Sequence, residues 1–299
     1  MIITKHRTAF FWITGVILAG AIAAIIFFGL PLSIDFTGGS LMQVSYPDGR
    51  PSLADIQTQI AKVPLGSVSV RESGDKAIVI RSRTLLPEEH AAVLAELSKG
   101  VSVTELAYTS IGPALGSQFA MKAMWALGAV ALAIMLYIAF AFRKVSRPVP
   151  SWLYGLAVVA ILLHDVIIPS GFYAILAHFT GVEVDALFIT ALLALLGYSV
   201  NDTIIIFDRV REHLAHNEKT NTKEPFEDTV GKSISETMTR SINTSLTVVL
   251  ALLALVFFGA AATRDFALVM LVGVIAGTYS SILLAAPLLI PFAKWFTKK

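Results

Sequence analysis

Six long apolar stretches dominate this 299-residue sequence and limit what the chain can fold into. A helix needs about 20 mainly apolar residues to cross a hydrocarbon layer roughly 30 Å thick. The stretches of that length are residues 9–30, 121–142, 152–178, 186–207, 242–262 and 266–292. The sequence therefore predicts an α-helical polytopic membrane protein with six transmembrane helices. The first stretch also allows a secretory signal, but its length and the Leu30-Pro31-Leu32 ending favour an uncleaved anchor.

The composition agrees with a membrane protein. Hydrophobic residues make up 56% of the chain, and the 15% that are charged gather in residues 43–110 and 208–240. Soluble domains carry about a quarter charged residues. The chain has no cysteine, which excludes disulfides, thiol catalysis and cysteine metal sites. A net charge of +2 is too small to indicate nucleic-acid binding.

Lysine and arginine in the short connections predict the orientation, because positive charge is retained on the cytoplasmic side. The short connections on one side of the membrane hold only Arg264. The other side holds Lys5, Arg7, Arg143, Lys144, Arg147, six basic residues within 209–240, Lys294, Lys298 and Lys299. We expect a multi-pass protein of the cytoplasmic (inner) membrane with both termini cytoplasmic.

This topology divides the chain into four parts. Residues 1–30 form the cytoplasmic N-terminus and first helix, and residues 31–118 form a periplasmic or extracytoplasmic domain. Residues 119–293 hold helices two to six with their cytoplasmic loops, and residues 294–299 form a cytoplasmic tail.

Short alternating runs replace the long apolar ones in the outward domain. They predict strands at 41–46, 68–72, 77–81 and 101–109, and helices at 52–62 and 87–98. This β-α-β-β-α-β order is that of a small α+β ferredoxin-like domain. It contains no nucleophile with a base, phosphate loop or metal cluster, so we expect neither an enzyme nor a cofactor. His90 stands alone in a glutamate-rich helix and reads as a solvated surface histidine.

Ionisable residues inside the spans are the functional candidates, because charge in a bilayer is costly. Asp202 lies five residues before the end of span four, about 7 to 8 Å inside it. Arg240 and Thr244 share one face at the matching end of span five. We hypothesise a proton switch in which Asp202 pairs with Arg240. A static ion pair, or an interfacial role for Arg240 alone, explains the residues equally well.

Further polar and small residues lie in the other spans. Asp165, beside His164 in span three, is either a relay member or a carboxyl kept protonated within the bundle, and the structural role is favoured. Gly273 and Gly277 form a G-x-x-x-G pattern that permits close helix packing. Pro169 and Gly171 interrupt span three as a kink or a packing bend. Asp208, Arg209, Arg211 and Glu212 read as boundary anchors and surface pairs.

Five motifs in order resemble the SecF family, the smaller membrane subunits of bacterial SecD/SecF pairs in the resistance-nodulation-division superfamily. The first is Asp35-Phe36-Thr37-Gly38-Gly39, and the second is Ile111-Gly-Pro-Ala-Leu-Gly116. The third runs from Gly197 through Asn201, Asp202 and Thr203 to Phe207-Asp-Arg-Val-Arg-Glu212. The last two are Thr239-Arg-Ser-Ile-Asn-Thr-Ser245 and Gly277-Thr-Tyr-Ser-Ser281. The resemblance covers nearly the whole chain.

The resemblance implies a function and a set of partners. Members of the family pair with SecD, assist preprotein export through the SecYEG channel, and use the proton-motive force; YajC is a further candidate partner. The family's proton-passage residues match Asp202, Arg240 and Thr244. The resemblance leaves open whether the coupling ion is H⁺ or Na⁺.

Two other functions remain open from the sequence. The superfamily also contains proton-coupled exporters of small molecules or lipids, although these carry two six-span halves in one chain. A scaffold, in which the buried charges only specify helix register, is the third interpretation.

Overall fold

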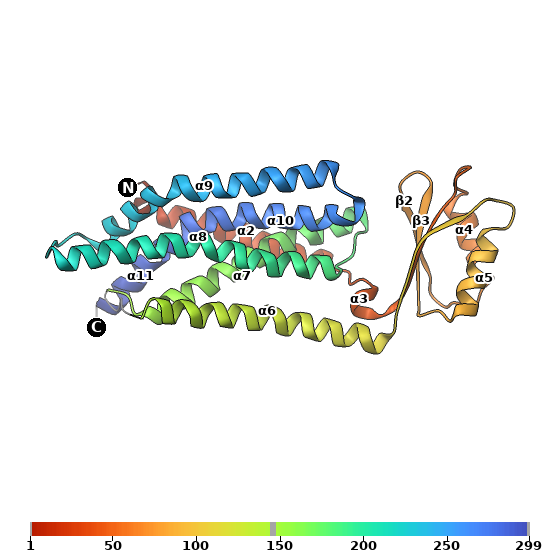
Figure 1. Cartoon of the computed structure of the whole chain (residues 1–299), viewed down its shortest axis with the longest axis horizontal. Coiled ribbons are helices and arrows are strands. Elements are labelled where there is room, and N and C mark those ends of the chain that lie inside the picture. Colours follow the sequence, from red (N-terminus) through yellow and green to blue (C-terminus); the bar gives the residue numbers. More distant parts are fainter. Residues whose placement is uncertain (1, 144–147, 298–299) are drawn as a thin grey trace. The chain divides into compact units, whose positions relative to one another are not determined.

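A computed structural model describes residues 2–143 and 148–297 (Figure 1). The chain forms two compact units, one of Met1–Pro31 with Trp125–Lys299 and one of Leu32–Met124. The predicted cytoplasmic residues Lys144, Arg147, Lys298 and Lys299 lie outside the described residues.

The first unit is a helical bundle. Its elements are α1 (Ile2–Lys5), α2 (Arg7–Phe28), the later part of α6 (Pro113–Ala141), α7 (Ser151–Thr180), α8 (Ala186–Lys219), α9 (Phe226–Phe258), α10 (Ala261–Ser280), the π-helix η1 (Ser281–Ala285) and α11 (Ala286–Thr297). Within the described residues, six helices are long and apolar enough to span a membrane, the last running through α10, η1 and α11. The prediction of a six-span membrane protein is confirmed.

Several helices are longer than their apolar stretches. α8 continues to Lys219, and α9 begins at Phe226, well before the predicted start of span five. Ion pairs such as Arg209–Glu236 join these two extensions. Hydropathy detects only the lipid-compatible part of a helix, whereas backbone hydrogen bonding continues for as long as packing and polar contacts support it.

The interior of the bundle is formed mainly by α7, α8 and the span that runs through α10, η1 and α11. Half of the residues in the most apolar stretch of α7 are buried, whereas only 11% are buried in the corresponding stretches of α2 and α6. α7 runs unbroken through Pro169. A Cβ atom at Gly171 would lie 2.6 Å from Ala21 Cα, so this glycine lets the backbones of α2 and α7 approach closely.

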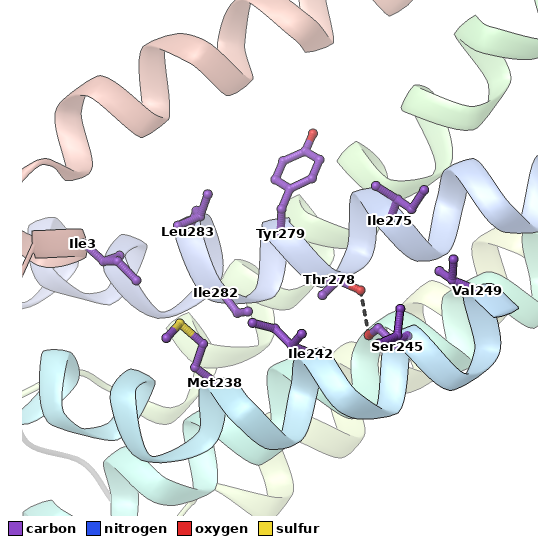
Figure 2. Close-up of a pocket in the computed structure, with 11 residues that line it drawn as sticks. Ile3, Met238, Ile242, Ser245, Val249, Ile275, Thr278, Tyr279, Ile282 and Leu283 are labelled. Atoms are coloured by element: carbon purple, nitrogen blue, oxygen red, sulfur yellow. Dashed lines mark hydrogen bonds between the residues drawn. The ribbon is translucent and has the colours of Figure 1, made fainter.

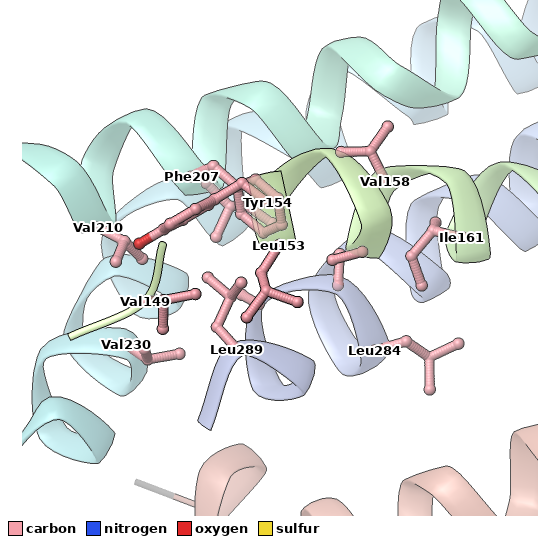
Figure 3. Close-up of a cluster of buried hydrophobic side chains, with 14 of the residues drawn as sticks. Val149, Leu153, Tyr154, Val158, Ile161, Phe207, Val210, Val230, Leu284 and Leu289 are labelled. Carbon is pink, nitrogen blue, oxygen red and sulfur yellow. The ribbon is translucent and has the colours of Figure 1, made fainter. Parts of the chain in front are cut away.

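One end of the bundle is held by ion pairs and an aromatic cluster. Glu227, at the start of α9, lies 2.5 Å from Arg7 and 4.0 Å from Lys294. These ion pairs join α2, α9 and α11. A buried hydrophobic cluster from α6 to α11 includes Phe142, Tyr154 and Phe207. Figure 3 shows Tyr154 and Phe207 within it. The Tyr154 and Phe207 rings meet edge to face at 5.3 Å, a favoured aromatic geometry.

The second unit is a four-stranded antiparallel sheet with two helices packed on it. The strands are β1 (Gly39–Ser45), β2 (Ser69–Ser73), β3 (Ala77–Ser82) and β4 (Thr104–Ile111), in the order β2-β3-β1-β4. α4 (Leu53–Ile60) and α5 (Pro87–Leu97) bury Ile56, Ile60, Val93 and Leu97 against inward residues of β1 and β3. The predicted ferredoxin-like domain is confirmed, and a short helix, α3 (Ile34–Thr37), precedes it.

His90 differs from the sequence-based expectation. Its Nε2 atom lies 2.8 Å from Glu105 Oε1, and its ring stacks on Tyr108 with centroids 4.0 Å apart. His90 remains partly exposed at the surface, as predicted, but it is paired and half-buried rather than alone and fully solvated. Both partners come from β4, and only the folded sheet brings that strand beside α5.

Candidate functional site

Asp202 is buried within the bundle on α8, with 2% of its surface exposed. Ser245 of α9 donates a hydrogen bond to Asp202 Oδ2 at 3.3 Å. Among the described residues, no donor reaches the other carboxylate oxygen, Oδ1, although that atom is buried. Leaving a buried oxygen unpaired is unfavourable, and more so when the group is charged. The site therefore holds a carboxyl group whose ionised form is only partly compensated.

Ser245 connects Asp202 to two other hydroxyl groups. The Tyr198 hydroxyl of α8 donates to Ser245 Oγ at 3.2 Å, and the Thr278 hydroxyl of α10 lies 2.7 Å from the same oxygen. Three helices thus meet at one serine side chain. We call Asp202, Ser245, Tyr198 and Thr278 the Asp202 network.

Ser245 ends the Thr239 to Ser245 motif, but the sequence assigned it no role in the site. It ends a buried stripe of small hydroxyl residues at four-residue spacing on α9: Ser233, Thr237, Ser241 and Ser245. This stripe is the signal that could have found it, because such spacing keeps side chains on one helical face.

Arg240 and Thr244 lie on an exposed part of α9. Although both Asp202 and Arg240 are described, no ion pair joins them in the structure. The Thr244 hydroxyl donates to the backbone oxygen of Arg240 at 2.9 Å. The contact expected between Asp202 and Arg240 is thus replaced by the hydrogen bond from Ser245.

Arg240 instead lines a polar cavity of about 330 Å³ between α8 and α9, together with Ile205, Asp208, Arg209, Glu212, Glu236 and Thr237. Asp202 precedes Ile205 by three residues, which places it about one turn further along the same face of α8. Arg209 Nε donates to Glu236 Oε2 at 2.5 Å, and His213 Nε2 lies 3.0 Å from the same oxygen. A charged, solvent-connected cavity therefore reaches to within about one helical turn of Asp202.

A second cavity lies between α9, α10 and η1 and measures about 520 Å³. Its lining residues are Ile3, Met238, Ile242, Ser245, Leu246, Val249, Ile275, Thr278, Tyr279, Ile282 and Leu283. Figure 2 shows Ser245 and Thr278 facing each other across the two helices, and the Tyr279 ring extending away from Ser245. Apart from these polar side chains the lining is aliphatic, so this cavity suits hydrocarbon better than water.

Asp165 is completely buried on α7 and belongs to a separate network. Its Oδ1 atom lies 2.7 Å from His164 Nδ1, and Ser199 of α8 donates to Oδ2. The Tyr279 hydroxyl lies 2.8 Å from His164 Nε2. Asp165 is thus not part of the Asp202 network.

Two glycines allow α10 to approach α8. A Cβ atom at Gly273 would lie 2.3 Å from Leu195 Cδ2, and one at Gly277 would lie 3.1 Å from Ser199 Cβ. The hydroxyls of Thr203 on α8 and Ser281, the first residue of η1, meet at 2.9 Å. Gly197 and Asn201 lie on the exposed side of α8, away from these contacts.

The Asp35 to Gly39 motif packs against the start of α6 within the second unit. Ser33 caps α3 by accepting from Asp35 N at 3.2 Å, Phe36 is buried, and Thr37 accepts from Arg81 at 2.8 Å. Gly38 and Gly39 have φ of +72° and +130°. A Cβ atom at Gly38 would lie 2.6 Å from Pro113 Cα, and one at Gly116 would lie 2.5 Å from Gly38 N. The backbones of the Asp35 to Gly39 motif and the Ile111 to Gly116 motif therefore touch, and this close contact requires glycine at both Gly38 and Gly116.

Comparison with known proteins identifies the family. The model described as "Protein export membrane protein SecD/SecF, C-terminal" matches residues 91–295, and the "SecD/SecF GG Motif" matches residues 23–46. The chain belongs to the SecD/SecF family. The second match contains the Asp35 to Gly39 motif, and the first contains both polar networks.

Relatives of SecF type are similar over nearly the full length. "Protein translocase subunit SecF" of Thermobaculum terrenum is 38% identical over 96% of this chain and 92% of its own, and that of Anaerolinea thermophila is 36% identical over 99% and 97%. The crystal structure of SecDF, a translocon-associated membrane protein from Thermus thermophilus, matches with a TM-score of 0.82 at 30% identity. That match covers 97% of this chain and 38% of the SecDF chain, so this chain spans well under half of SecDF.

No group of three or more histidine, cysteine or acidic side chains that could hold a metal ion occurs within residues 2–143 and 148–297.

Proposed function

We propose that this chain is a SecF-type subunit that acts with SecD to promote preprotein export across the cytoplasmic membrane, using the proton-motive force. Its relatives of nearly equal length are named protein translocase subunits, which supports the assignment. Its similarity to 38% of the SecDF chain supports a role as one part of a larger assembly. It acts as a transport component without a catalytic reaction of its own.

The buried and half-satisfied carboxyl of Asp202 carries the proposal for proton coupling. When it is ionised, Oδ1 lacks a donor and the charge lies among apolar helices. When it is protonated, the group is neutral and can itself donate a hydrogen bond. The two forms favour different packing of α8, α9 and α10, which is the requirement for a two-state element.

Arg240 and Thr244 supply the second half of the proposed switch. The polar cavity lets the long Arg240 side chain remain hydrated while Asp202 is protonated. A rotation or slide of α9 that brings the guanidinium to Asp202 would stabilise the ionised form. Thr244, which hydrogen-bonds the Arg240 backbone, lies one turn further along α9. We place Asp165 in the same proton pathway.

The energy available is sufficient for such a switch. One elementary charge that crosses a potential of 100 mV releases about 2.3 kcal/mol. Three protons per cycle would supply about 6.9 kcal/mol, which exceeds the roughly 5.5 kcal/mol that reverses a strongly biased two-state equilibrium.

We further propose that both termini and the polar cavity face the cytoplasm and that residues 31–118 face outward. Lysine and arginine distribution supports this orientation. The proposed partners are SecD, the SecYEG channel, YajC, exported preproteins and the surrounding lipid bilayer.

The proposal is tested by export into inverted membrane vesicles that contain the chain with SecD and SecYEG. We expect Asp202→Asn to abolish the export that an imposed H⁺ gradient drives, while the protein remains in the membrane. Asp228→Asn, an exposed aspartate at the start of α9, is the matched control and should export normally. Undiminished gradient-driven export by Asp202→Asn would sink the proposal.

The same vesicles identify the coupling ion and separate the other functions. Export that responds to an imposed Na⁺ gradient but not to an imposed H⁺ gradient would identify Na⁺, rather than H⁺, as the coupling ion. Co-purification with SecYEG distinguishes a translocase subunit from an exporter of small molecules or lipids. Proton conductance that depends on Asp202 distinguishes both from a scaffold.

A further inference from the structure

We propose that His164 and Asp165 together form a second proton-binding site in the bundle, separate from Asp202, which takes up and releases one proton as a pair. The inference deepens the proposed function, on which its use in export depends. It goes beyond a pathway role for the carboxylate alone, because His164, Ser199 and Tyr279 are part of the site.

The geometry of the pair leads to this inference. Asp165 is fully buried and His164 is 4% exposed, yet they lie in direct contact at 2.7 Å. Ser199 donates to the second carboxylate oxygen, and the Tyr279 hydroxyl lies 2.8 Å from the far nitrogen of the imidazole. Every polar atom of both side chains therefore has a partner, which marks an organised site rather than a trapped charge.

Charge balance shows what the site binds. An ionised Asp165 beside a neutral His164 carries one net negative charge. No lysine or arginine contacts the pair in the described part of the chain, so nothing offsets that charge. One added proton makes the pair neutral overall, and we place it on the Asp165 carboxylate, where the imidazole of His164 can hydrogen-bond to it. Because net charge in a dry interior is strongly disfavoured, the closed packing of α7, α8 and α10 favours the neutral, proton-bound form of the pair.

The surroundings contain few other titratable groups. In the described part of the chain, the side chains that hydrogen-bond the pair from other helices are Tyr279 of α10 and Ser199 of α8. α2 has no titratable residue after Arg7, η1 has none, and α11 has only Lys294 near its end. α6 carries Lys122 and Tyr137, which are both exposed. Asp202 on α8 hydrogen-bonds Ser245 instead. Titration of the pair is thus set by its own contacts.

The two networks are adjacent along the chain. Tyr198 and Thr278 belong to the Asp202 network, whereas the residues that follow them, Ser199 and Tyr279, contact the His164–Asp165 pair. A movement of α10 relative to α8 therefore alters both sites together. The π-helix η1 begins two residues after Tyr279, and such segments are frequent at functional sites.

Close packing keeps water out while the proton is held. A Cβ atom at Gly277 would lie 3.5 Å from Asp165 Oδ2 and 3.1 Å from Ser199 Oγ. α10 therefore covers the carboxylate with a backbone surface. Separation of α10 from α7 would admit water and favour release of the proton.

The test is an infrared titration of the full chain in lipid nanodiscs, which follows the carbonyl band of protonated carboxyl groups as pH changes. We expect two buried aspartate bands. Asp165→Asn should remove one and Asp202→Asn the other. His164→Gln should keep the Asp165 band but shift its midpoint by about one pH unit or more, because the imidazole no longer shares the proton.

Two further variants keep the test decisive if Asp165→Asn does not fold. Tyr279→Phe removes only the hydroxyl that meets His164 and should shift the same band. Ser170→Ala removes a buried hydroxyl on α7 that bonds its own backbone at Val166, and it should leave both bands unchanged. An Asp165 band that does not change with pH, or that ignores both His164→Gln and Tyr279→Phe, would overturn the inference.

This measurement is independent of export. If the Asp165 band titrates while Asp202→Asn still exports normally, the proposed function fails and the second site stands. If Asp202→Asn abolishes export while Asp165 never titrates, the opposite holds.

Discussion

Ser245 donates to one carboxylate oxygen of Asp202 at 3.3 Å, while the other oxygen of the same group is buried without a donor within the described residues. This asymmetry distinguishes Asp202 from Asp165, whose two oxygens both have partners. A half-satisfied carboxyl gains more from a new partner than a fully satisfied one, because an unpaired buried oxygen is the costly state. Asp202 is therefore the group most responsive to a rearrangement of α9.

The first prediction concerns Ser245 and its neighbour on the same helical face. Ser245→Ala removes the hydrogen bond to Asp202 and should destabilise the bundle by about 1 to 3 kcal/mol. Ser241→Ala is the matched control, since the Ser241 hydroxyl is equally buried but has no partner in the structure. Loss of the Ser241 hydroxyl should leave the stability of the bundle unchanged or raise it slightly. Thermal unfolding of the full chain in detergent measures both, and equal effects would contradict the role assigned to Ser245.

The second prediction separates steric fit from backbone conformation in the Gly38 motif. Gly38 and Gly74 have nearly the same φ, +72° and +69°, but only Gly38 has backbone atoms where a Cβ would lie. Gly74→Ala should destabilise the outward domain by about 1 to 2 kcal/mol through its φ alone. Gly38→Ala should be worse by about another 1 to 3 kcal/mol, because Pro113 cannot move aside without moving α6.

Hydrogen exchange of the β1 and β3 amides in the full chain measures this difference. A Gly38→Ala chain as stable as Gly74→Ala would show that α6 yields easily, and that the close contact between the two glycine motifs has little energetic value.

The third prediction concerns the contact between α2 and α7. Gly171→Ala places a Cβ against the backbone of Ala21 and should weaken this packing by about 1 to 3 kcal/mol. Gly20→Ala, at the residue before Ala21, has open space and should be neutral or stabilising by up to about 1 kcal/mol. Protease sensitivity of the connection after α2 reports the difference. Similar sensitivity of the two variants would contradict the packing role of Gly171.

The fourth prediction is a pH dependence in the outward domain. The Arg83 guanidinium, with help from the Leu86 backbone amide, lowers the pKa of Glu89 from 4.5 to about 2. A carboxyl whose folded-state pKa is lowered contributes stability above its unfolded pKa and loses it as pH falls toward the folded value. The first turn of α5 should therefore loosen between about pH 4.5 and pH 2.

Glu89→Gln tests the assignment, because it keeps the shape of the side chain but removes the charge. We expect the variant to be less stable than the native chain at neutral pH and to match it near pH 2. The readout is hydrogen exchange at the start of α5. The same pH dependence in the variant would assign the effect to another group.

Local patterns predicted the outward domain well. Alternation along β1 and β3 and the turn at Gly74 defined a hairpin-rich order that the sheet confirms. The pairing of Gly38 with Pro113 and Gly116 was not predictable, because these residues lie more than 70 positions apart in the sequence. His90 was misread for the same reason, since its partners lie on a strand that folding brings beside it.

Hydropathy along the chain established the number of spans and their residue types, because the free energy of placing a residue in hydrocarbon depends mainly on that residue and its helical neighbours. The same pattern marked Asp202 and Asp165 as costly and therefore informative. Folding is what brings Ser245, rather than Arg240, to Asp202 in this conformation, and what encloses Asp165 with His164, Ser199 and Tyr279. The rotation of each helix about its axis sets these contacts. That rotation follows from packing at positions such as Gly171, Gly273 and Gly277, where distant segments meet.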